Sequence, residues 1–187
     1  MHVIYKTIVE FIMRYLFLPV LLFLITSATT DSRHNYPIPE KTKERLFFIQ
    51  RNLNSNTIVY DARFDKHGNL NESSPMDIYW IRYDEYGQRM ELRTIEKNLA
   101  FGIEFSKLNN YNYYKVNIVA EKNRDIHLKQ TAPFEAKAFV MINNRMSQLN
   151  YLYLVADDTG FLPELKSIEY FGTDTLTKRS TYEKVLY

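Results

Sequence analysis

One segment of the sequence, Asp77–Asp84 (DIYWIRYD), combines the only tryptophan of the chain with an arginine two positions later. In an extended strand, residues two apart point to the same side, so Trp80 and Arg82 share a face with Ile78. A guanidinium stacked on an aromatic ring contributes about 0.5–2 kcal/mol. Together with Arg51 from an earlier strand, Trp80 and Arg82 would form a patch that accepts an anion or stacks against a sugar.

The same pattern has a simpler interpretation in terms of packing. Large aromatic side chains are mostly buried, and an arginine that leaves the solvent needs a carboxylate partner. In that case Trp80 lies in the core and Arg82 pairs with an acid such as Asp61. Packing is the better interpretation of Trp80, while the set Trp80, Arg82 and Arg51 is the best candidate for a ligand-binding site.

No other group of residues has the spacing of a catalytic or metal-binding motif. His34, His67 and His127 are far apart, and no H-E-x-x-H, G-x-S-x-G or phosphate-binding glycine loop occurs. The oxygen-rich stretch from Asp61 to Asn71 lacks the ligand order of a calcium loop. We therefore predict no catalytic residue, no metal site and no cofactor, although carboxylates that meet only in the folded chain would escape this search.

The elements that position these residues are predicted to be β-strands. Alternation of apolar and polar residues predicts strands at 45–52, 57–64, 77–84, 89–93, 113–121, 125–131, 134–142, 148–156 and 165–172. Short connections rich in Asn, Asp and Gly predict antiparallel neighbours, with residues 85–88 as the turn of a hairpin. The fold class is mainly β, an antiparallel sandwich or closed barrel of about eight or nine strands.

One short helix is predicted at residues 94–101, near the middle of the chain. Ile95 and Leu99 have helical spacing there. Thr94 can cap the N-terminus of this helix, and Gly102 can end it in a left-handed conformation.

Composition indicates a globular chain without a nucleic-acid partner. Of 187 residues 45% are hydrophobic, and 15 Tyr and 12 Phe favour sheet over helix. A net charge of +2 is too small for the basic footprint of a nucleic-acid-binding protein. Cysteine is absent, which excludes disulfides, thiolate chemistry and a lipid-modified cysteine.

The N-terminus has the pattern of a secretory signal peptide. Arg14 precedes an apolar run at residues 15–25, and small residues up to Ala28 follow. The run is shorter than the roughly 20 apolar residues of a membrane-spanning helix. We predict cleavage near Ala28, a periplasmic or secreted protein, and no stable membrane span afterwards. A compact signal also begins at Met13, which is the alternative start of the chain.

The sequence therefore divides into four parts. A signal peptide (1–28) is followed by a polar leader (29–44), a single β domain (45–172) and a polar, peripheral tail (173–187). An exported domain without disulfides must be held together by its core, which is feasible because a chain of about 150 residues buries roughly 70% of its unfolded surface.

From Leu46 to about Gly172 the chain resembles the DUF4833 family of uncharacterised exported proteins, found mainly in Bacteroidetes. The segments that carry the resemblance are LFFIQRNLNSNTIVYD, MDIYWIRYD, LAFG and LKSIEYFG. The resemblance implies export, and it implies no activity, because the family has no assigned one.

Three functions are compatible with these features. The first is a non-enzymatic, exported β domain that binds a ligand or partner at the bacterial envelope. The second is a hydrolase of envelope or dietary polymers whose acids converge only in the fold, and the third is a structural envelope component. An enzyme would need two or more acids or a histidine in one cleft, whereas a binding module needs a lined cavity without them. The sequence specifies neither the ligand nor an oligomeric state.

Overall fold

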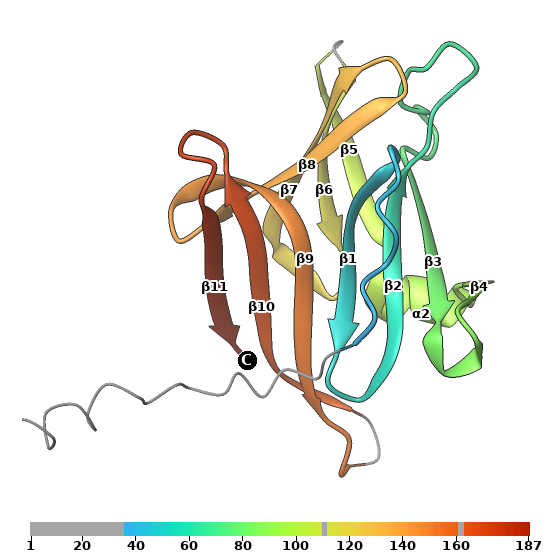
Figure 1. Ribbon diagram of the computed structural model, residues 1–187, viewed down its shortest axis with the longest axis vertical. Coiled ribbons are helices and arrows are strands. Elements are labelled where there is room, and N and C mark those ends of the chain that lie inside the picture. Colours follow the sequence, from blue (N-terminus) through green and yellow to red (C-terminus); the bar gives the residue numbers. More distant parts are fainter. Residues whose placement is uncertain (1–35, 110–111, 161–162) are drawn as a thin grey trace, which may run out of the picture. The chain divides into compact units, whose positions relative to one another are not determined.

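The fold is built from strands that follow one another with short connections (Figure 1). The computed structural model describes residues 36–109, 112–160 and 163–187, which belong to one compact unit, Asn35–Tyr187. The predicted signal peptide and the alternative start at Met13 lie outside the described residues. The described strands are β1 (Arg45–Arg51), β2 (Asn54–Ala62), β3 (Met76–Arg82), β4 (Gln88–Glu91), β5 (Ile103–Asn109), β6 (Tyr113–Ile118), β7 (Glu121–Ala132), β8 (Glu135–Ile142), β9 (Arg145–Asp157), β10 (Glu164–Asp174) and β11 (Ser180–Leu186).

Strand β9 is the junction of the sheet. Its first part pairs with β8, and its later residues pair in parallel with β1, with Tyr151 opposite Phe48. Along its other side β9 pairs with β10, which pairs with β11. The path across the sheet is β4-β3-β2-β1-β9-β8-β7-β6-β5, and every described pair except β1–β9 is antiparallel.

The nine strands on this path form a strongly curled, open half-barrel (Figure 1). The prediction of a mainly β fold is confirmed. The prediction of a closed barrel or a sandwich is wrong, for two reasons. A barrel closes only when its end strands pair, and β4 and β5 do not pair with each other within the described residues. A sandwich needs two separate sheets, whereas β9 joins all the described strands into one.

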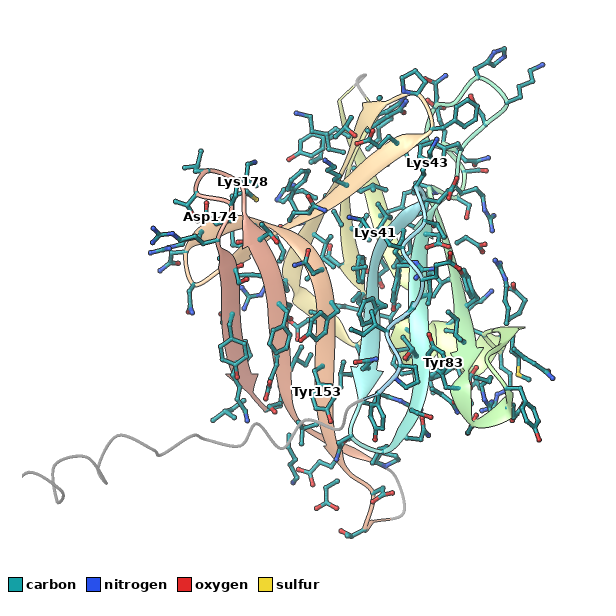
Figure 2. All side chains as sticks on the ribbon, viewed as in Figure 1. Lys41, Lys43, Tyr83, Tyr153, Asp174 and Lys178 are labelled. Carbon is teal, nitrogen blue, oxygen red and sulfur yellow. The ribbon has the colours of Figure 1, made fainter. Side chains whose placement is uncertain are left out.

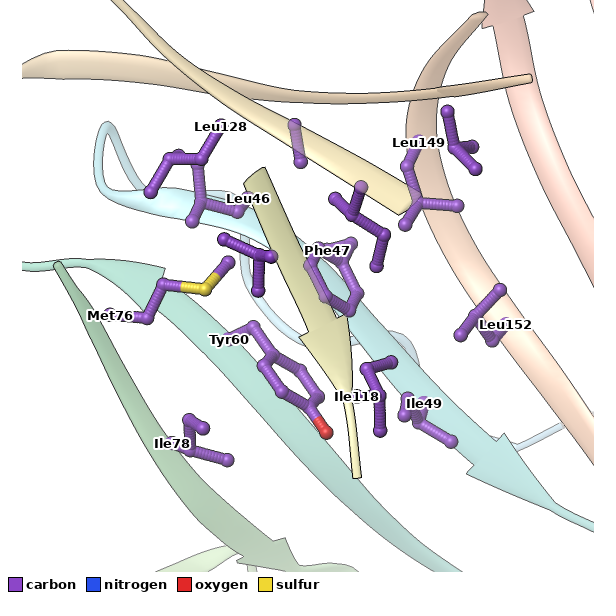
Figure 3. Close-up of a cluster of buried hydrophobic side chains, with 14 of the residues drawn as sticks. Leu46, Phe47, Ile49, Tyr60, Met76, Ile78, Ile118, Leu128, Leu149 and Leu152 are labelled. Atoms are coloured by element: carbon purple, nitrogen blue, oxygen red, sulfur yellow. The ribbon is translucent and has the colours of Figure 1, made fainter. Parts of the chain in front are cut away.

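The core lies on the inner side of the curl (Figure 3). Phe47 of β1 stacks on Tyr60 of β2 with ring centres 4.4 Å apart, and both side chains are fully buried. Burial raises the pKa of the Tyr60 hydroxyl, so the hydroxyl stays protonated and donates to the carbonyl of Phe101 at 2.7 Å. The core thus fixes the position of the segment that precedes β5.

The predicted helix at 94–101 is present as two short helical segments, α2 (Thr94–Glu96) and η2 (Lys97–Phe101), and η2 is a π-helical turn. The predicted roles of its end residues are wrong. Arg93 occupies the N-cap position in place of Thr94, and its backbone N–H donates to the Glu96 carboxylate at 2.8 Å. Gly102 has φ −66, which is not left-handed. Glycine is needed there because a Cβ would lie 2.2 Å from the carbonyl oxygen of Lys97.

The hairpin predicted from DIYWIRYD is confirmed, with Trp80 of β3 opposite Met90 of β4. Its turn is η1 (Tyr83–Glu85), a single 3₁₀ turn. Two strands were not predicted, β5 and β11. Strand β11 forms within the polar tail and pairs with β10 from Ser167 to Thr173. No helix within 36–109, 112–160 or 163–187 is long and apolar enough to cross a membrane.

Residues 36–44 of the polar leader have no regular secondary structure but are attached to β1. The amide of Gln50 donates to the carbonyl of Pro37 at 2.9 Å, and the hydroxyl of Tyr36 donates to the carbonyl of Asn52 at 3.3 Å. These contacts attach the described part of the leader to the end of β1 and the residue that follows it.

Candidate functional site

Trp80, the centre of the predicted ligand-binding patch, is a core residue. Its side chain is only 5% exposed and packs edge-on against Phe101 with ring centres 5.5 Å apart. The indole Nε1 donates to the Glu96 carboxylate at 3.4 Å. The ring is therefore enclosed between β3 and the helical segment, as the packing interpretation expected.

Arg51 is the arginine that stacks on Trp80. Its guanidinium lies 4.8 Å from the centre of the Trp80 ring and 5.9 Å from that of Phe101. Nη2 donates to the side chain of Asn54 at 3.1 Å, while the buried Nε has no hydrogen-bond partner among the described residues. Burial lowers the pKa of Arg51, and the nearby charge of Arg82 lowers it further. The stack predicted between Trp80 and Arg82 is thus made by Arg51 instead.

Arg82 is occupied by acids of its own turn. Its guanidinium pairs with Glu85 at 2.7 Å and with Asp84 at 3.5 Å, and its side chain is 28% exposed. The suggested pairing with Asp61 is wrong. Asp61 instead pairs with Arg45 at 2.6 Å and accepts a hydrogen bond from Tyr79 at 2.7 Å. The three predicted residues are neighbours, but the ring of Trp80 is covered; ligand binding by this set remains a prediction.

Ionic contacts hold β3 in place on the outer side of the sheet. Asp77 pairs with Arg89 at 2.7 Å and with Arg63 at 3.0 Å. Burial alone would raise the pKa of the Asp77 carboxyl, but the hydrogen bonds and charges of the two arginines lower it. Arg89 also lies 3.7 Å from the centre of the Tyr79 ring. These contacts attach the start of β3 to Arg63 and to Arg89 of β4.

A cleft of about 550 Å³ lies between β3 and β5. One wall is Met76, Asp77 and Ile78, and the other is Ile103, Glu104 and Phe105; we call this space the β3–β5 cleft. Its volume falls within the range of about 300–1,000 Å³ that is typical of ligand pockets. None of these residues belonged to the predicted patch. The alternation of Ile103 and Phe105 after Gly102 is the sequence signal that could have shown the second wall.

The two walls are strand edges. Strand β4 pairs with β3 only from Tyr79 to Arg82, so Met76–Ile78 extend beyond it. Strand β5 pairs with β6 on one side, and no described strand pairs with its other side. The backbone amides and carbonyls along such an edge can pair with a further strand.

Strand β5 is attached to its neighbours at both of its ends. At one end the amides of Val119 and Ala120 donate to the carbonyls of Gly102 and Ala100 at 2.9 and 3.1 Å, which attaches the helical segment to the β6–β7 turn. At the other end Glu72, in the connection after β2, forms an ion pair with Lys107 of β5. These contacts position β5, which forms one wall of the cleft.

The cleft has an apolar floor and a charged rim. Met76 and Ile78 are buried, and Phe105 is 39% exposed although it faces inward opposite the buried Val116. Three basic and three acidic side chains line the rim: Arg63, Lys97, Lys122, Asp77, Glu91 and Glu104. Each of the acids pairs with a Lys or Arg, so the rim is close to neutral.

A second concavity of about 710 Å³ lies where β1 and β8 diverge from β9. It is basic, because Lys41, Lys43, Arg45 and Lys137 line it with a single acid, Glu135. One wall is formed by the described part of the leader, with the side chains of Lys41 and Lys43 (Figure 2), and residues 36–44 have no regular secondary structure. The β3–β5 cleft, which is built on strands, is the more precisely formed of the two.

A cluster of titratable groups lies apart from both concavities. Arg124 of β7 pairs with Glu183 of β11 at 2.8 Å and lies 4.6 Å from the centre of the Tyr170 ring. Burial raises the pKa of the nearby Glu121 carboxyl, and the charge of Arg124 opposes this rise. Within the described part of the chain, no group of three or more His, Cys, Asp or Glu side chains could hold a metal ion.

Comparison with known proteins places the chain in one family. No curated protein and no solved structure matches it. A family model, DUF4833, described as a domain of unknown function, matches residues 47–184. This range begins in β1 and ends in β11, so it includes both walls of the β3–β5 cleft. The resemblance found in the sequence is confirmed, and the chain belongs to the DUF4833 family.

Proposed function

We propose that this protein is a non-enzymatic, exported domain that binds a ligand or partner at the bacterial envelope, and that the β3–β5 cleft is its binding site. Export and the envelope location are supported by the signal-like N-terminus. The observation that carries the binding proposal is the cleft itself, a slot of about 550 Å³ with an apolar floor between two strand edges.

The character of the cleft favours binding over catalysis. A general acid needs a carboxyl group whose proton is retained near neutral pH by burial away from cations. The carboxylates of Asp77 and Glu104 are instead paired with Arg63 and Lys122 at 3.0 and 2.5 Å. Glu121, whose pKa is raised, lies outside the cleft lining. The cleft offers contact area and orientation, which are the requirements of a binding site.

The cysteine-free chain allows a direct test of this site. We would label Ser106→Cys on β5 with an environment-sensitive fluorophore, and Ser180→Cys on β11 as the matched control. Both serines are exposed and lie on edge strands, but only Ser106 is next to the cleft. The probes are random decapeptide pools, muropeptides from digested peptidoglycan, and mixed phospholipid–lipopolysaccharide micelles.

We expect at least one probe class to change the emission of the label at position 106 with saturation, and to leave the label at position 180 unchanged. If no class changes the emission at position 106, or if every class changes both labels equally, the β3–β5 cleft is not the binding site.

A further inference from the structure

We infer that the ligand of the β3–β5 cleft is an extended polypeptide segment of a partner protein, which adds a strand to β5. This inference rests on the proposed function, because it names the kind of ligand that the same cleft takes. Three features support it: the unpaired strand edges of β5 and β3, the directions in which the side chains of β5 point, and the charge of the rim.

The edge of β5 provides a template of defined length. Its pairing with β6 is regular from Ile103 to Lys107, and a register shift follows before Asn109. A strand rises about 3.3 Å per residue, so this regular part spans roughly 17 Å. Main-chain hydrogen bonds to such an edge are the source of affinity when a peptide adds a strand to a sheet.

The opposite wall of the cleft, formed by β3, also offers an unpaired strand edge to a bound segment. Met76–Ile78 of β3 project beyond the end of β4, and they line the same cleft as Ile103–Phe105. A segment laid along β5 therefore has strand backbone on one side and the uncovered end of β3 on the other. A row of alternating N–H and C=O groups at strand spacing is the chemistry of a polypeptide, and a glycan does not have it.

The side chains predict the pattern of the partner. Ile103 and Phe105 are paired with Ile118 and Val116, which are core residues, so they face inward. A partner side chain that points the same way enters the apolar floor beside Phe105. The next side chain points outward, toward Glu104 and Lys122. Apolar and polar residues must therefore alternate in the partner segment.

The charges of the rim exclude a strongly charged partner. Three basic and three acidic side chains line the cleft, and each acid is already paired. A polyanion or polycation would be attracted by half of the rim and repelled by the other half. The partner segment is accordingly close to neutral.

A row of partly exposed aromatic side chains elsewhere does not provide a better site for a sugar. Phe48, Tyr151, Phe171 and Tyr182 form a row across β1, β9, β10 and β11, with ring centres 5.2, 4.3 and 5.1 Å apart. Tyr151 lies within 6° of parallel to Phe48 on one side and to Phe171 on the other, so these rings stack on one another. Ring faces that are stacked in this way are not presented to a sugar.

The test uses a displayed library of random decapeptides, selected against the full chain. Recovered peptides are synthesised and titrated against the unmodified protein, Phe105→Glu and Leu108→Glu. Phe105 faces the cleft and Leu108 follows the regular template, while the two are similarly exposed at 39% and 46%. We expect alternating peptides that bind at least tenfold more weakly to Phe105→Glu and within twofold to Leu108→Glu. Thermal melting of both variants checks that they fold.

A second measurement identifies the backbone contacts. Single N-methylation along the best peptide removes one N–H at a time and leaves the side chains in place. In an added strand only every second N–H points to β5, so we expect binding to be lost at alternate positions. Equal effects at all positions, or none, contradict strand addition, even if Phe105→Glu cannot be purified.

Other results separate this inference from the proposed function. If muropeptides or micelles change the label at position 106 and no library peptide competes with them, the cleft binds a ligand that is not a polypeptide, and only the inference fails. If the chain is a dimer in light scattering and Phe105→Glu makes it a monomer, the edge is used by a second copy, and the partner inference is again wrong.

Discussion

The guanidinium of Arg51 lies 4.8 Å from the ring of Trp80, and this contact joins the end of β1 to β3 across the intervening strand β2. Trp80 is a core residue that is only 5% exposed, and the guanidinium of Arg51 covers the ring. Packing accounts for the positions of Trp80 and Arg51, so substitutions at this contact should change the stability of the fold.

Truncation of Trp80 should weaken the fold. We expect Trp80→Ala to lower the free energy of unfolding by about 3–5 kcal/mol, the usual cost of removing a large buried aromatic side chain. Urea unfolding followed by circular dichroism measures this, since the substitution removes the only tryptophan. The control is Leu176→Ala, at a side chain that is 89% exposed, with an expected change within about 0.5 kcal/mol. Equal stability of the two variants would contradict the core position of Trp80.

Gly102 should tolerate no side chain. A Cβ at this position would lie 2.2 Å from the Lys97 carbonyl oxygen, so Gly102→Ala must distort the π-helical turn. We expect a loss of about 1–3 kcal/mol, as for other overpacked positions. Gly87→Asn is the control, because its Cβ would meet nothing closer than Tyr83 at 4.0 Å and Asn accepts φ +74. If Gly102→Ala melts no lower than Gly87→Asn, the close approach to Lys97 is incorrect.

The buried carboxyl of Glu121 should make the fold less stable as pH rises. Its folded pKa is raised by burial, so between its unfolded and folded pKa values the native state holds a proton that the unfolded state has lost. Stability from this group is present at acidic pH and falls as pH rises through that window. We expect Glu121→Gln to be more stable than the unmodified protein at pH 7, and the difference to vanish below the unfolded pKa. A constant difference at all pH values would rule out this cause.

Glu183, in the same cluster, should behave in the opposite way. Burial alone would raise its pKa, but hydrogen bonds from Arg124 and from the backbone of Asn143 lower it. Because the folded pKa is lowered, the ionised carboxylate stabilises the fold above the unfolded pKa. This stabilisation is lost as pH falls through the folded pKa. We expect Glu183→Gln to be less stable at pH 7 and to approach the unmodified protein in acid. Denaturant titrations of both variants over a pH series measure the two opposite slopes.

The sequence predicts most strands of this fold because one side of each strand is apolar. Strand β6 is an example, with Val116 and Ile118 buried and Lys115 and Asn117 on the other side. Strands β5 and β11 escape prediction because polar residues occupy positions that face inward, such as Lys107 opposite the core residue Tyr114. An edge strand needs less apolar surface than a central one, so its pattern is weaker.

The candidate site is less predictable than the fold because it depends on contacts distant in sequence. The parallel pairing of Phe48 with Tyr151 makes the sheet fork at β9, and no local pattern indicates it. The stack on Trp80 was assigned to the wrong arginine because the acids Asp84 and Glu85 follow Arg82 immediately and bind it. Residues that share a cleft only through the curl of a sheet have no periodic signal.

The neutral rim of the β3–β5 cleft should make peptide binding nearly independent of salt. Exposed charges are screened within about 8–10 Å at ordinary ionic strength, so a ligand held by net charge weakens steeply as salt increases. The acids Asp77 and Glu104 are already paired with Arg63 and Lys122, and a near-neutral segment gains little from their charge. We expect the dissociation constant of a selected decapeptide to change less than about threefold between roughly 0.05 and 0.5 M sodium chloride. Fluorescence titration of the label at position 106 measures this. A change of about a hundredfold would instead show that net charge holds the peptide, and it would contradict the neutral rim as the recognition surface.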